Sequence, residues 1–493
     1  LKAVDGQGSV VNIIGEPGIG KSRLIAELRK RDVIKRVSFL EGRAISIGKN
    51  LSFYPIITLL KQWAQITEDD KEAQAFGKIE TATRAIHPDE TDEILPFVAT
   101  LMGMKLKDRH AQRVEGIAGE ALENLIFKNV RELLIKMADL RPTVWIMEDL
   151  HWADASSIKL LESLQPLTEK HRLLFINVFR PGYLEKIGKM AVVGDQVEIE
   201  LQPLEKTAGE ALINNMLLIE GLPNNVKEQI LVRAGGNPFF IEEVVRSLID
   251  EGAVVKGDDG FEVTAKIDQV AIPPTINDVL MARLDRLEGR TRELVKVASV
   301  IGRSFFDLII KDVAGSIDKI DDRLAYLKDI QLIKDRTRMQ ELEYMFKHAL
   351  AQEAAYASTL LQQRKALHLK VAQAIERIFE ERLYEFYGML AFHYSKGEDL
   401  DKAEKYLTKA GEEALKASAS SEALSYLQEA LKLYVDRYGE DTDPEKLIRF
   451  EKNIALALYN NAQWSEAVDY FDKVLEQLGA PVPKKGIGGF ALS

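Results

Sequence analysis

The sequence contains no cysteine, and this absence excludes several classes of site at once. Disulfides, thiolate zinc sites, iron–sulfur clusters and cysteine nucleophiles all require thiols. The chain also lacks an apolar stretch approaching the roughly 18 residues that a membrane-spanning helix needs. We therefore expect no membrane partner, and the absent thiols are compatible with a reducing, cytoplasmic location.

The chain has no excess of basic residues. Its 66 Lys and Arg face 77 Asp and Glu, giving a net charge of −11, which disfavours broad nucleic-acid coating or an anionic membrane as the main partner. A length of 493 residues predicts about three domains at roughly 150 residues each. The chain begins at Leu1 without an initiator Met, and a strand follows by Val10. Because both ends look cut, we expect a piece of a longer protein.

Short runs that are apolar throughout are spread over the first 200 residues, between segments with helical patterns. Such runs, without alternation, are typical of strands buried on both faces of a parallel sheet, and interleaved helices indicate an open α/β sheet. The stretch between residues 51 and 140 is predicted to be a long helical insertion. The runs are Val10–Ile14, Val37–Leu40, Thr143–Met147, Leu173–Val178 and Val197–Leu201.

After Pro203 the strands are expected to stop, and residues 205–250 are predicted to be helical. Pro273 and Pro274 mark a linker. Beyond them, helices near 276–287, 290–300 and 317–328 precede strand-like runs at 332–335 and 342–346. Three helices and a β-pair suggest a winged-helix module.

From about residue 380 onward almost everything reads as amphipathic helix, with a weak internal repeat. Small residues placed around a large one let paired helices approach closely, as in tetratricopeptide-type (TPR-like) hairpins. A plain helical bundle remains the alternative because the intervals are unequal. The repeated triplets are Ala403, Leu407 and Ala410, then Ala423, Leu427 and Ala430, then Ala467, Phe471 and Val474.

The predicted fold class is multidomain: an α/β domain whose first strand leads into the sequence GEPGIGKS of a P-loop NTPase, then a helical segment that such an NTPase would use as a lid, a winged helix and all-α TPR-like repeats. The expected boundaries are 1–204 for the NTPase domain, 205–270 for the lid, 271–350 for the winged helix, 351–379 for a helical linker and 380–493 for truncated repeats.

Residues 15–22 read GEPGIGKS and match the phosphate-loop pattern G-x-x-x-x-G-K-[ST] in full. A strand precedes the loop and a helix-forming run follows it, which is the required context. Gly15, Gly18 and Gly20 would let backbone N–H groups converge on phosphate oxygens. Lys21 would contact the β- and γ-phosphates, and the Ser22 hydroxyl would bind Mg²⁺. A plain Gly-rich turn is the weaker alternative.

A phosphate site of this kind needs carboxylates at the end of a neighbouring strand, and Glu148 and Asp149 follow the run at 143–147. We assign Glu148 to the metal and Asp149 to the attacking water, although the two roles could be exchanged and a helix-capping role is the alternative for Asp149. Asp154 is predicted to be an N-cap only. Arg180, ending the next strand, could sense the γ-phosphate, with an ordinary surface arginine as the alternative. Asn237 as N-cap and Pro238 at the first helical position explain the GGNPFF segment without any ligand.

The motifs GEPGIGKSRL, EDLHWADASSIKLLESL, FRP and GNPFFIEEVVRSLIDEG resemble those of the STAND class of signalling P-loop ATPases. The most similar branch is fused to class III adenylyl cyclases, protein kinases and large LuxR-type regulators. The resemblance covers roughly residues 8–365 and implies ATP or ADP with Mg²⁺ as ligands. A Gly-Arg-Glu element that normally precedes the first strand is missing, which puts part of the adenine pocket in doubt.

The resemblance also implies roles at matching positions. Arg180 would be the sensor, Pro238 would pack on the adenine, and His348 would lie against the ADP phosphates, with a buried structural histidine as the alternative. His151 and Trp152 belong to the signature without a clear physical role. The nucleotide-binding residues predicted in this way are Gly15, Glu16, Pro17, Gly18, Ile19, Gly20, Lys21, Ser22, Arg23, Pro238 and His348.

The leading functional hypothesis is a slowly hydrolysing nucleotide switch that controls an effector domain elsewhere in the longer protein. A protein or small molecule at the C-terminal repeats would bias it, and a nucleotide-dependent oligomer is a possible output. The alternatives are a housekeeping ATPase and a nucleotide-dead repeat scaffold. We do not expect direct DNA binding, because the candidate recognition helix at 316–329 carries four acids against three bases.

Overall fold

The computed structural model describes most of the chain, and its contacts divide the chain into two compact units. Unit 1 comprises Leu1–Arg43, Arg141–His151 and Gln165–Ala374, and unit 2 comprises Ala44–Leu140, Trp152–Leu164 and Ile375–Ser493. Both ends of the chain, on which the prediction of a truncated protein rests, lie outside the described residues. Those described are 7–45, 51–67, 70–183, 195–217, 222–257, 260–269, 272–338 and 341–480.

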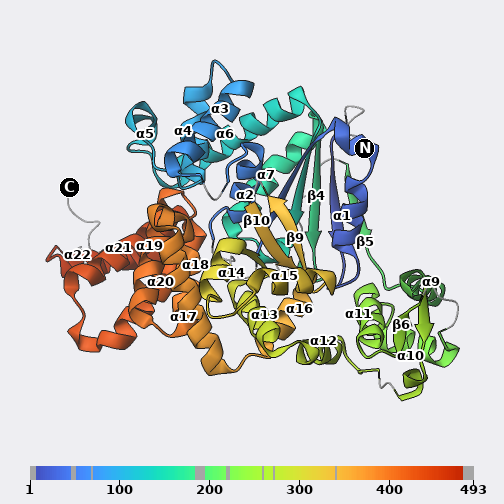
Figure 1. The fold of residues 1–493 in the computed structure, drawn as a ribbon. Helices are drawn as coiled ribbons and strands as arrows, with labels where there is room; N and C mark the ends of the chain where they lie inside the picture. The colour runs from blue at the N-terminus through green and yellow to red at the C-terminus, as the bar shows by residue number, and fades with distance from the viewer. Residues whose placement is uncertain are drawn as a thin grey trace, which may run out of the picture. The chain divides into compact units, whose positions relative to one another are not determined.

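The centre of unit 1 is a five-stranded sheet with the order β2-β3-β4-β1-β5, in which every neighbouring pair is parallel (Figure 1). All five predicted apolar runs are strands of it. In β1 and β4 the buried residues Asn12 and Asn177 lie in register, and Asn177 Nδ2 donates to Asn12 Oδ1 at 2.9 Å. The strands are β1 (Ser9–Ile14), β2 (Ser38–Arg43), β3 (Thr143–Glu148), β4 (Leu173–Phe179) and β5 (Gln196–Glu200).

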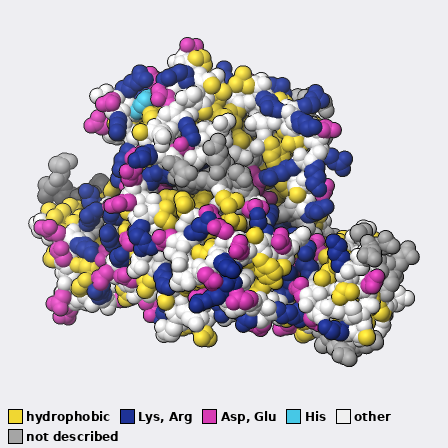
Figure 2. Space-filling model, in the orientation of Figure 1, with side chains coloured by type: hydrophobic (Ala, Val, Ile, Leu, Met, Phe, Trp, Pro, Cys, Tyr) yellow, Lys and Arg dark blue, Asp and Glu magenta, His cyan; other side chains and the backbone are white. Residues whose placement is uncertain are grey.

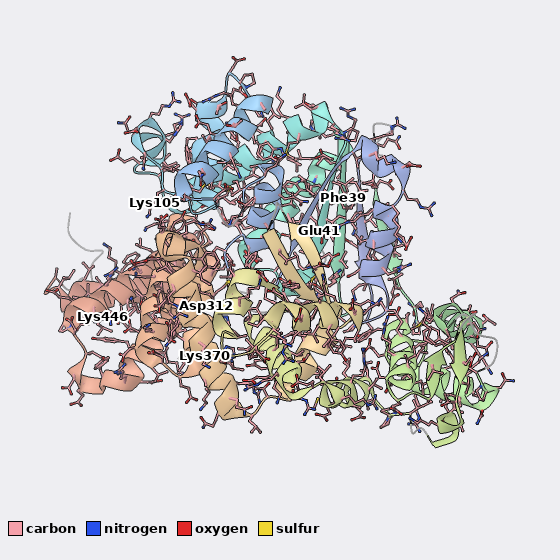
Figure 3. The ribbon with its side chains drawn as sticks, viewed as in Figure 1. Phe39, Glu41, Lys105, Asp312, Lys370 and Lys446 are labelled. Carbon is pink, nitrogen blue, oxygen red and sulfur yellow. The ribbon has the colours of Figure 1, made fainter. Side chains whose placement is uncertain are left out.

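Helix α1 (Lys21–Arg29) leads out of the phosphate loop and its C-terminal end packs on edge strand β2. The Arg29 guanidinium lies over the Phe39 ring, 5.2 Å from its centroid, and pairs with the carboxylate of Glu41. Phe39 and Glu41 are labelled in Figure 3. A guanidinium over an aromatic face gains electrostatic attraction while its stem covers apolar surface. These contacts hold the helix that begins at Lys21 against the sheet.

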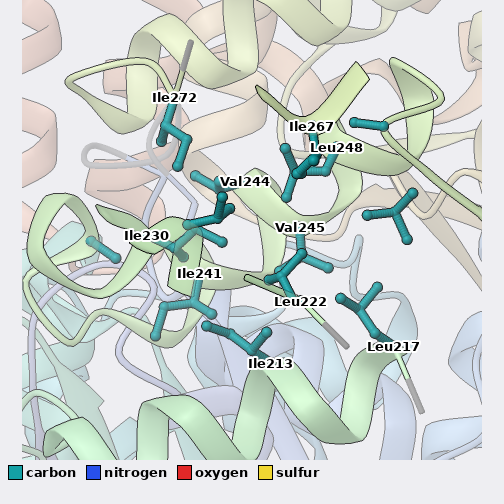
Figure 4. Close-up of a cluster of buried hydrophobic side chains, with 14 of the residues drawn as sticks. Ile213, Leu217, Leu222, Ile230, Ile241, Val244, Val245, Leu248, Ile267 and Ile272 are labelled. Atoms are coloured by element: carbon teal, nitrogen blue, oxygen red, sulfur yellow. The ribbon is translucent and has the colours of Figure 1, made fainter. Parts of the chain in front are cut away.

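The predicted lid folds around a hydrophobic core, to which Ile272 and Val279 beyond the predicted boundary also contribute (Figure 4). Three helices build it, as expected, but strands do not stop after Pro203: a two-stranded antiparallel hairpin, β6 and β7, closes the core. Strands of three residues are too short to show an alternating pattern in the sequence. The elements are α9 (Lys206–Leu217), α10 (Asn224–Ala234), α11 (Pro238–Asp250), β6 (Val254–Lys256) and β7 (Phe261–Val263).

Residues 276–378 form helices and a second, three-stranded sheet with the order β8-β10-β9. Strand β8 and helix α14 were not predicted, because three and seven residues carry too little periodicity. Helix α15 begins at Ile320 rather than near 316, after Lys319 with a φ of 51°. The winged-helix interpretation stays a prediction. The elements are α12 (Ile276–Arg286), α13 (Gly289–Ile301), β8 (Ser304–Phe306), α14 (Asp307–Val313), α15 (Ile320–Asp329), β9 (Ile333–Arg338), β10 (Glu341–Phe346), α16 (Ala349–Ala357) and α17 (Leu361–Ile378).

Unit 2 is helical, as predicted for the insertion and for the C-terminal region. Consecutive helices from α18 to α22 pack on one another. The predicted triplets lie on the packed faces, and a Cβ on Gly411 of α19 would come within 2.6 Å of Leu427 Cγ of α20. The helices are α2 (Tyr54–Trp63), α3 (Glu72–Ile86), α4 (Thr91–Leu101), α5 (Asp108–Val114), α6 (Gly119–Leu140), α7 (Ala155–Leu164), α18 (Tyr387–Gly397), α19 (Leu400–Lys416), α20 (Ser420–Tyr438), α21 (Pro444–Asn460) and α22 (Trp464–Gln477).

Two buried carboxylates cap the N-terminus of α7 within unit 2. Asp154 accepts from the backbone N–H of Ser157 at 2.8 Å, which confirms its N-cap role, and also from the N–H of Phe53 at 3.0 Å. Glu422 of α20 accepts from the N–H and the hydroxyl of Ser156 at 3.1 and 2.5 Å. Burial, followed by the negative charge of Glu422, raises the pKa of Asp154 to about 7. Glu422 of the C-terminal repeats thus stabilises the N-terminus of α7, the α-helix that follows Glu148 and Asp149 in the sequence.

Basic and acidic side chains alternate over the molecular face shown in Figure 2. Such mixing agrees with a chain whose two charge types are nearly balanced. Within the described ranges, no helix combines the length and apolar character needed to cross a membrane.

Candidate nucleotide-binding site

The predicted phosphate loop connects β1 to α1 in unit 1. Lys21 is the first residue of α1, so the loop ends at a helix N-terminus, where backbone N–H groups and the helix dipole favour anions. Ile19 is buried, whereas Ser22 and Arg23 are exposed on the first turn. The loop therefore has the geometry that the sequence predicted, with the Ser22 hydroxyl open to a ligand.

The loop glycines are needed for more than one physical reason. Gly18 and Gly20 have φ values of 83° and 113°, a region that side chains with a Cβ rarely adopt. A Cβ on Gly18 would lie 2.8 Å from Asn237 Oδ1 of the lid. A Cβ on Gly20 would meet no atom of the described residues within 4 Å, so among protein contacts it is the positive φ that favours glycine at this position.

Lys21 folds back over the loop. Its Nζ donates to the carbonyl oxygens of Gly15 and Glu16 at 2.6 and 2.9 Å. Burial lowers the pKa of Lys21 to about 8, although the negative charge of Asp149 opposes the shift. A desolvated ammonium held only by neutral carbonyl groups gains from an anionic partner, which is what a phosphate would supply.

The two predicted acids lie where β3 ends. Glu148 is buried and faces Arg43 of β2 across the sheet register, and the two side chains form an ion pair. Asp149 has a φ of 58°, an uncommon conformation for a residue other than glycine. Its carboxylate pairs with Arg303 and lies 3.9 Å from Arg43 Nε. Burial alone would raise the pKa of Asp149, but Arg303 and Arg43 outweigh it and hold that pKa below its usual value.

Arg180 follows β4 at the same carboxyl edge of the sheet. It is close enough that its charge lowers the pKa of Lys21, after the larger effect of burial. Its Nη2 lies 3.5 Å from the carboxylate of Glu353 in α16. The predicted sensor therefore adjoins both the phosphate loop and a helix near the C-terminal end of unit 1.

The lid contacts the phosphate loop directly. Asn237 caps α11 by accepting from the N–H groups of Phe239 and Phe240, as predicted, and its Nδ2 donates to the Pro17 carbonyl at 3.0 Å. The Phe239 N–H points to the Gly18 carbonyl at 3.4 Å. Pro238 is the first residue of α11 and lies between these two contacts in the sequence. Whether it packs on adenine stays a prediction.

His348 joins the lid to the region that follows it. Its ring stacks on Phe239 with 3.7 Å between centroids and 28° between planes. Burial, aided by Lys347 and Arg303, lowers the pKa of His348 to about 2, so the ring is neutral. Its Nε2 is buried and has no hydrogen-bond partner within the described part of the chain. Burial likewise lowers the pKa of His151 to about 4.

Two residues of this site were missed by sequence reasoning, Arg43 and Arg303. Arg43 ends β2 at the carboxyl edge of the sheet, just beyond the run Val37–Leu40 that was predicted as this strand, so its proximity to that run was a usable signal. Arg303 immediately precedes β8 and is distant in sequence from every motif, so only the tertiary structure places it at Asp149. His151 and Trp152 gained no chemical role from the contacts described here.

The residues fit a phosphate ligand with a divalent cation. Lys21, Arg43, Arg180 and Arg303 gather around the loop and the two acids, and the buried Nε–H of Arg303 is a donor that has no hydrogen-bond partner among the described residues. Buried unpaired donors and a desolvated ammonium favour anionic oxygens. Glu148, Asp149 and the Ser22 hydroxyl are oxygen donors of the type that Mg²⁺ prefers.

Comparison with known families covers this part of the chain. The AAA ATPase domain model matches residues 1–176, which include the phosphate loop and both acids. A second model, "Domain of unknown function (DUF8739)", matches residues 205–260, which correspond to most of the lid.

The chain is similar to parts of much longer proteins. It is 25% identical over 451 residues to an uncharacterized protein of Rhizobium meliloti (strain 1021), covering 89% of this chain and 41% of that protein. It is 23% identical over 339 residues to a peroxide stress-activated histidine kinase of Schizosaccharomyces pombe, covering 63% and 14%. The chain therefore spans less than half the length of either relative.

Among solved structures, the chain is similar to a STAND protein with a tetratricopeptide repeat sensor from Pyrococcus horikoshii, at 14% identity and a TM-score of 0.42, covering 97% of this chain and 75% of that one. That likeness is too low to carry weight. The matched family model instead identifies residues 1–176 of this chain as an AAA ATPase domain, which contains the phosphate loop and both acids.

Proposed function

We propose that this ATPase is a slow, nucleotide-operated switch in signal transduction, and that its turnover is not its output. It would bind ATP with Mg²⁺, hydrolyse it weakly and remain closed with ADP. Exchange of ADP for ATP would then release the lid and the region from α12 to α16. A housekeeping ATPase and a nucleotide-dead scaffold remain the alternatives.

The observation that carries this proposal is the contact between lid and phosphate loop. Asn237 donates to the Pro17 carbonyl, and Phe239 packs so closely that a Cβ on Gly18 would lie 2.9 Å from Phe239 Cβ. If nucleotide binding changes the conformation of the phosphate loop, the packing of α11 on that loop must therefore change as well. Because Phe239 of α11 also stacks on His348, the same change would alter the packing of the region that follows the lid.

The residues at the site would divide the chemistry between them. Lys21 and the N-terminus of α1 would bind the phosphates, and Arg180 would contact the γ-phosphate. Ser22 and Glu148 would hold Mg²⁺, which when bound would supply Lewis-acid stabilisation of the phosphate charge. Asp149 would accept the proton of the attacking water. For Glu148 this requires that it release Arg43, its present partner.

Input and output of the switch are proposed to lie outside this site. An effector domain of the same longer protein would receive the signal, and a protein or small molecule would bind the C-terminal repeats. The repeats contain a groove of about 510 Å³ between α19 and α21, with Glu412, Lys416 and Arg449 among its lining residues. A ligand there would shift the switch only by its difference in affinity for the two states. Nucleotide-dependent oligomerisation is a further possible output.

The first test is to denature the purified protein and identify any released nucleotide by chromatography. Lys21→Ala is the loss-of-binding variant and Lys30→Ala, an exposed lysine at the end of α1, is its matched control. We expect near-stoichiometric ADP from the wild type and the control, and none from Lys21→Ala. Fast ATP turnover without retained nucleotide would instead indicate a housekeeping ATPase. Neither retention nor turnover would indicate a scaffold.

The sensing role of the repeats has its own test. A chain ending near residue 380 should release ADP at a changed rate, measured with a fluorescent ADP analogue. An unchanged rate would remove the sensing role. Because this truncation also takes Glu422 away from α7, Glu422→Gln in the full chain serves as the control for that local loss.

A further inference from the structure

The pairing of Arg303 with Asp149 has a consequence for the proposed reaction. Arg303 Nη1 donates to Asp149 Oδ2, and the two side chains are only 13% and 14% exposed. A partly buried, charge-assisted contact of this kind is stronger than a surface ion pair. The acceptor in this contact is the same carboxylate that, in the proposed function, accepts a proton from the attacking water.

The backbone fixes where Arg303 stands. Gly302 has a φ of 149° and a ψ of −171°, a conformation open essentially to glycine, and it turns the chain from α13 into β8. The Arg303 carbonyl accepts from the Phe346 N–H at 2.9 Å, next to the β8–β10 ladder. The guanidinium therefore moves with this small sheet, and a displacement of the sheet must change its contact with Asp149.

From this geometry we propose that Arg303 is a positioning residue that withholds the Asp149 carboxylate from the attacking water while the β8–β10 sheet is in place. The proposal rests on the proposed function, in which Asp149 is the proton acceptor. A carboxylate oxygen that accepts from a guanidinium has less capacity to accept from water. Hydrolysis is then slow because the base is held, and movement of the sheet releases it.

Arg303 is suited to such an exchange of partners. Its Nε is buried and no described residue accepts from it, so one donor of the guanidinium is available for another acceptor. An anionic phosphate oxygen could take this donor, and the planar guanidinium can hold two oxygens at once. The same side chain can therefore pass from Asp149 toward the nucleotide when the sheet moves.

The test is a single-turnover measurement on the full chain, with bound radiolabelled ATP and Mg²⁺, comparing wild type, Arg303→Gln and Arg303→Lys. We expect Arg303→Gln to hydrolyse bound ATP about tenfold faster than wild type, with an ATP dissociation constant changed less than about threefold. Arg303→Lys, which retains one charged donor, should fall between them. Arg290→Gln, an exposed arginine on α13 that pairs with Glu293 at 3.0 Å, should match the wild type.

Each other outcome overturns the proposal in an identifiable way. A slower or unchanged rate in Arg303→Gln with ATP still bound would show that Arg303 stabilises the transition state or is not used, while the proposed switch would survive. A wild type that binds no ATP would overturn both proposals. If Arg303→Gln fails a thermal melting check, Arg303→Lys decides, since it must still be faster than wild type.

Discussion

The imidazole of His348 lies flat on the ring of Phe239, 3.7 Å between centroids. Phe239 is the second residue of the lid helix α11, and His348 is the N-cap of α16. Residues far apart in the sequence thus meet beside the phosphate loop, since the Phe239 N–H also points to the Gly18 carbonyl. This stack joins the lid to the region beyond it.

Replacing His348 should speed ADP release. His348→Ala removes both the stack and the unpartnered Nε2, and a loss of about 1.4 kcal/mol of binding corresponds to roughly tenfold faster release. His348→Phe keeps an aromatic ring but no ring nitrogen, so it should release ADP nearly as fast. The measurement is stopped-flow release of a fluorescent ADP analogue. A His348→Phe rate equal to wild type would mean that His348 only packs.

Replacing Asp149 should separate binding from hydrolysis. Asp149→Asn keeps the size of the side chain but removes its basicity, so ATP should stay bound while turnover falls about 10²- to 10⁴-fold. Asp32→Asn, a 93% exposed acid in unit 1, is the control and should turn over ATP normally. The readout is phosphate release beside nucleotide retention. Normal turnover in Asp149→Asn would assign the base to another residue.

Asn237 both caps α11 and donates to the phosphate loop, and substitutions can separate these two roles. Asn237→Ala loses the cap of α11 and the donation to Pro17, so it should cost about 1 kcal/mol of stability and speed nucleotide exchange. Asn237→Asp keeps an acceptor for the cap but no donor, so it should melt like wild type and still exchange faster. Slow exchange in Asn237→Asp would contradict a role for the contact between lid and loop.

Asp154 should make stability depend on pH. Its pKa is raised from the usual 3.8 to about 7, first by burial and then by Glu422. The folded protein thus keeps a proton that the unfolded chain has released, and stability falls as pH rises from about 4 to about 7. Asp154→Asn keeps an oxygen for the Phe53 and Ser157 N–H groups and should flatten this slope by up to about 1.4 kcal/mol per pH unit.

Thermal melts between pH 4 and pH 8 would measure this slope. Asp436→Asn, an exposed acid on α20, is the matched control and should keep the wild-type pH dependence. An Asp154→Asn protein whose melting temperature falls with pH as steeply as wild type would show that another group binds the proton.

The parallel sheet and the phosphate loop were readable from the sequence because their signals are local. Val10–Ile14 is apolar throughout, and GEPGIGKS fixes both residue types and spacing. The N-caps Asn237 and Asp154 follow from the same local chemistry. By contrast β6, β7 and β8 are strands of three residues each, which is too short for any periodicity to be seen.

The two arginines that pair with the acids were missed for different reasons. Arg43 was within reach, because it ends a strand adjacent to β3. Arg303 was not, because its contact with Asp149 spans 154 positions and depends on how β8 is seated. The stack of His348 on Phe239 could not be predicted either. The resemblance implied separate roles for His348 and for Pro238, the neighbour of Phe239, but no contact between the two segments.

The chain passes back and forth between its two units, because each unit is built from three separate segments. Strand β3, with Glu148 and Asp149 at its end, belongs to a piece of unit 1 that covers only residues 141–151. Both flanking segments, 44–140 and 152–164, belong to unit 2. The acidic strand is thus tethered to unit 2 by covalent bonds at both ends. Because the chain leaves and re-enters each unit in this way, no contiguous fragment contains either unit alone.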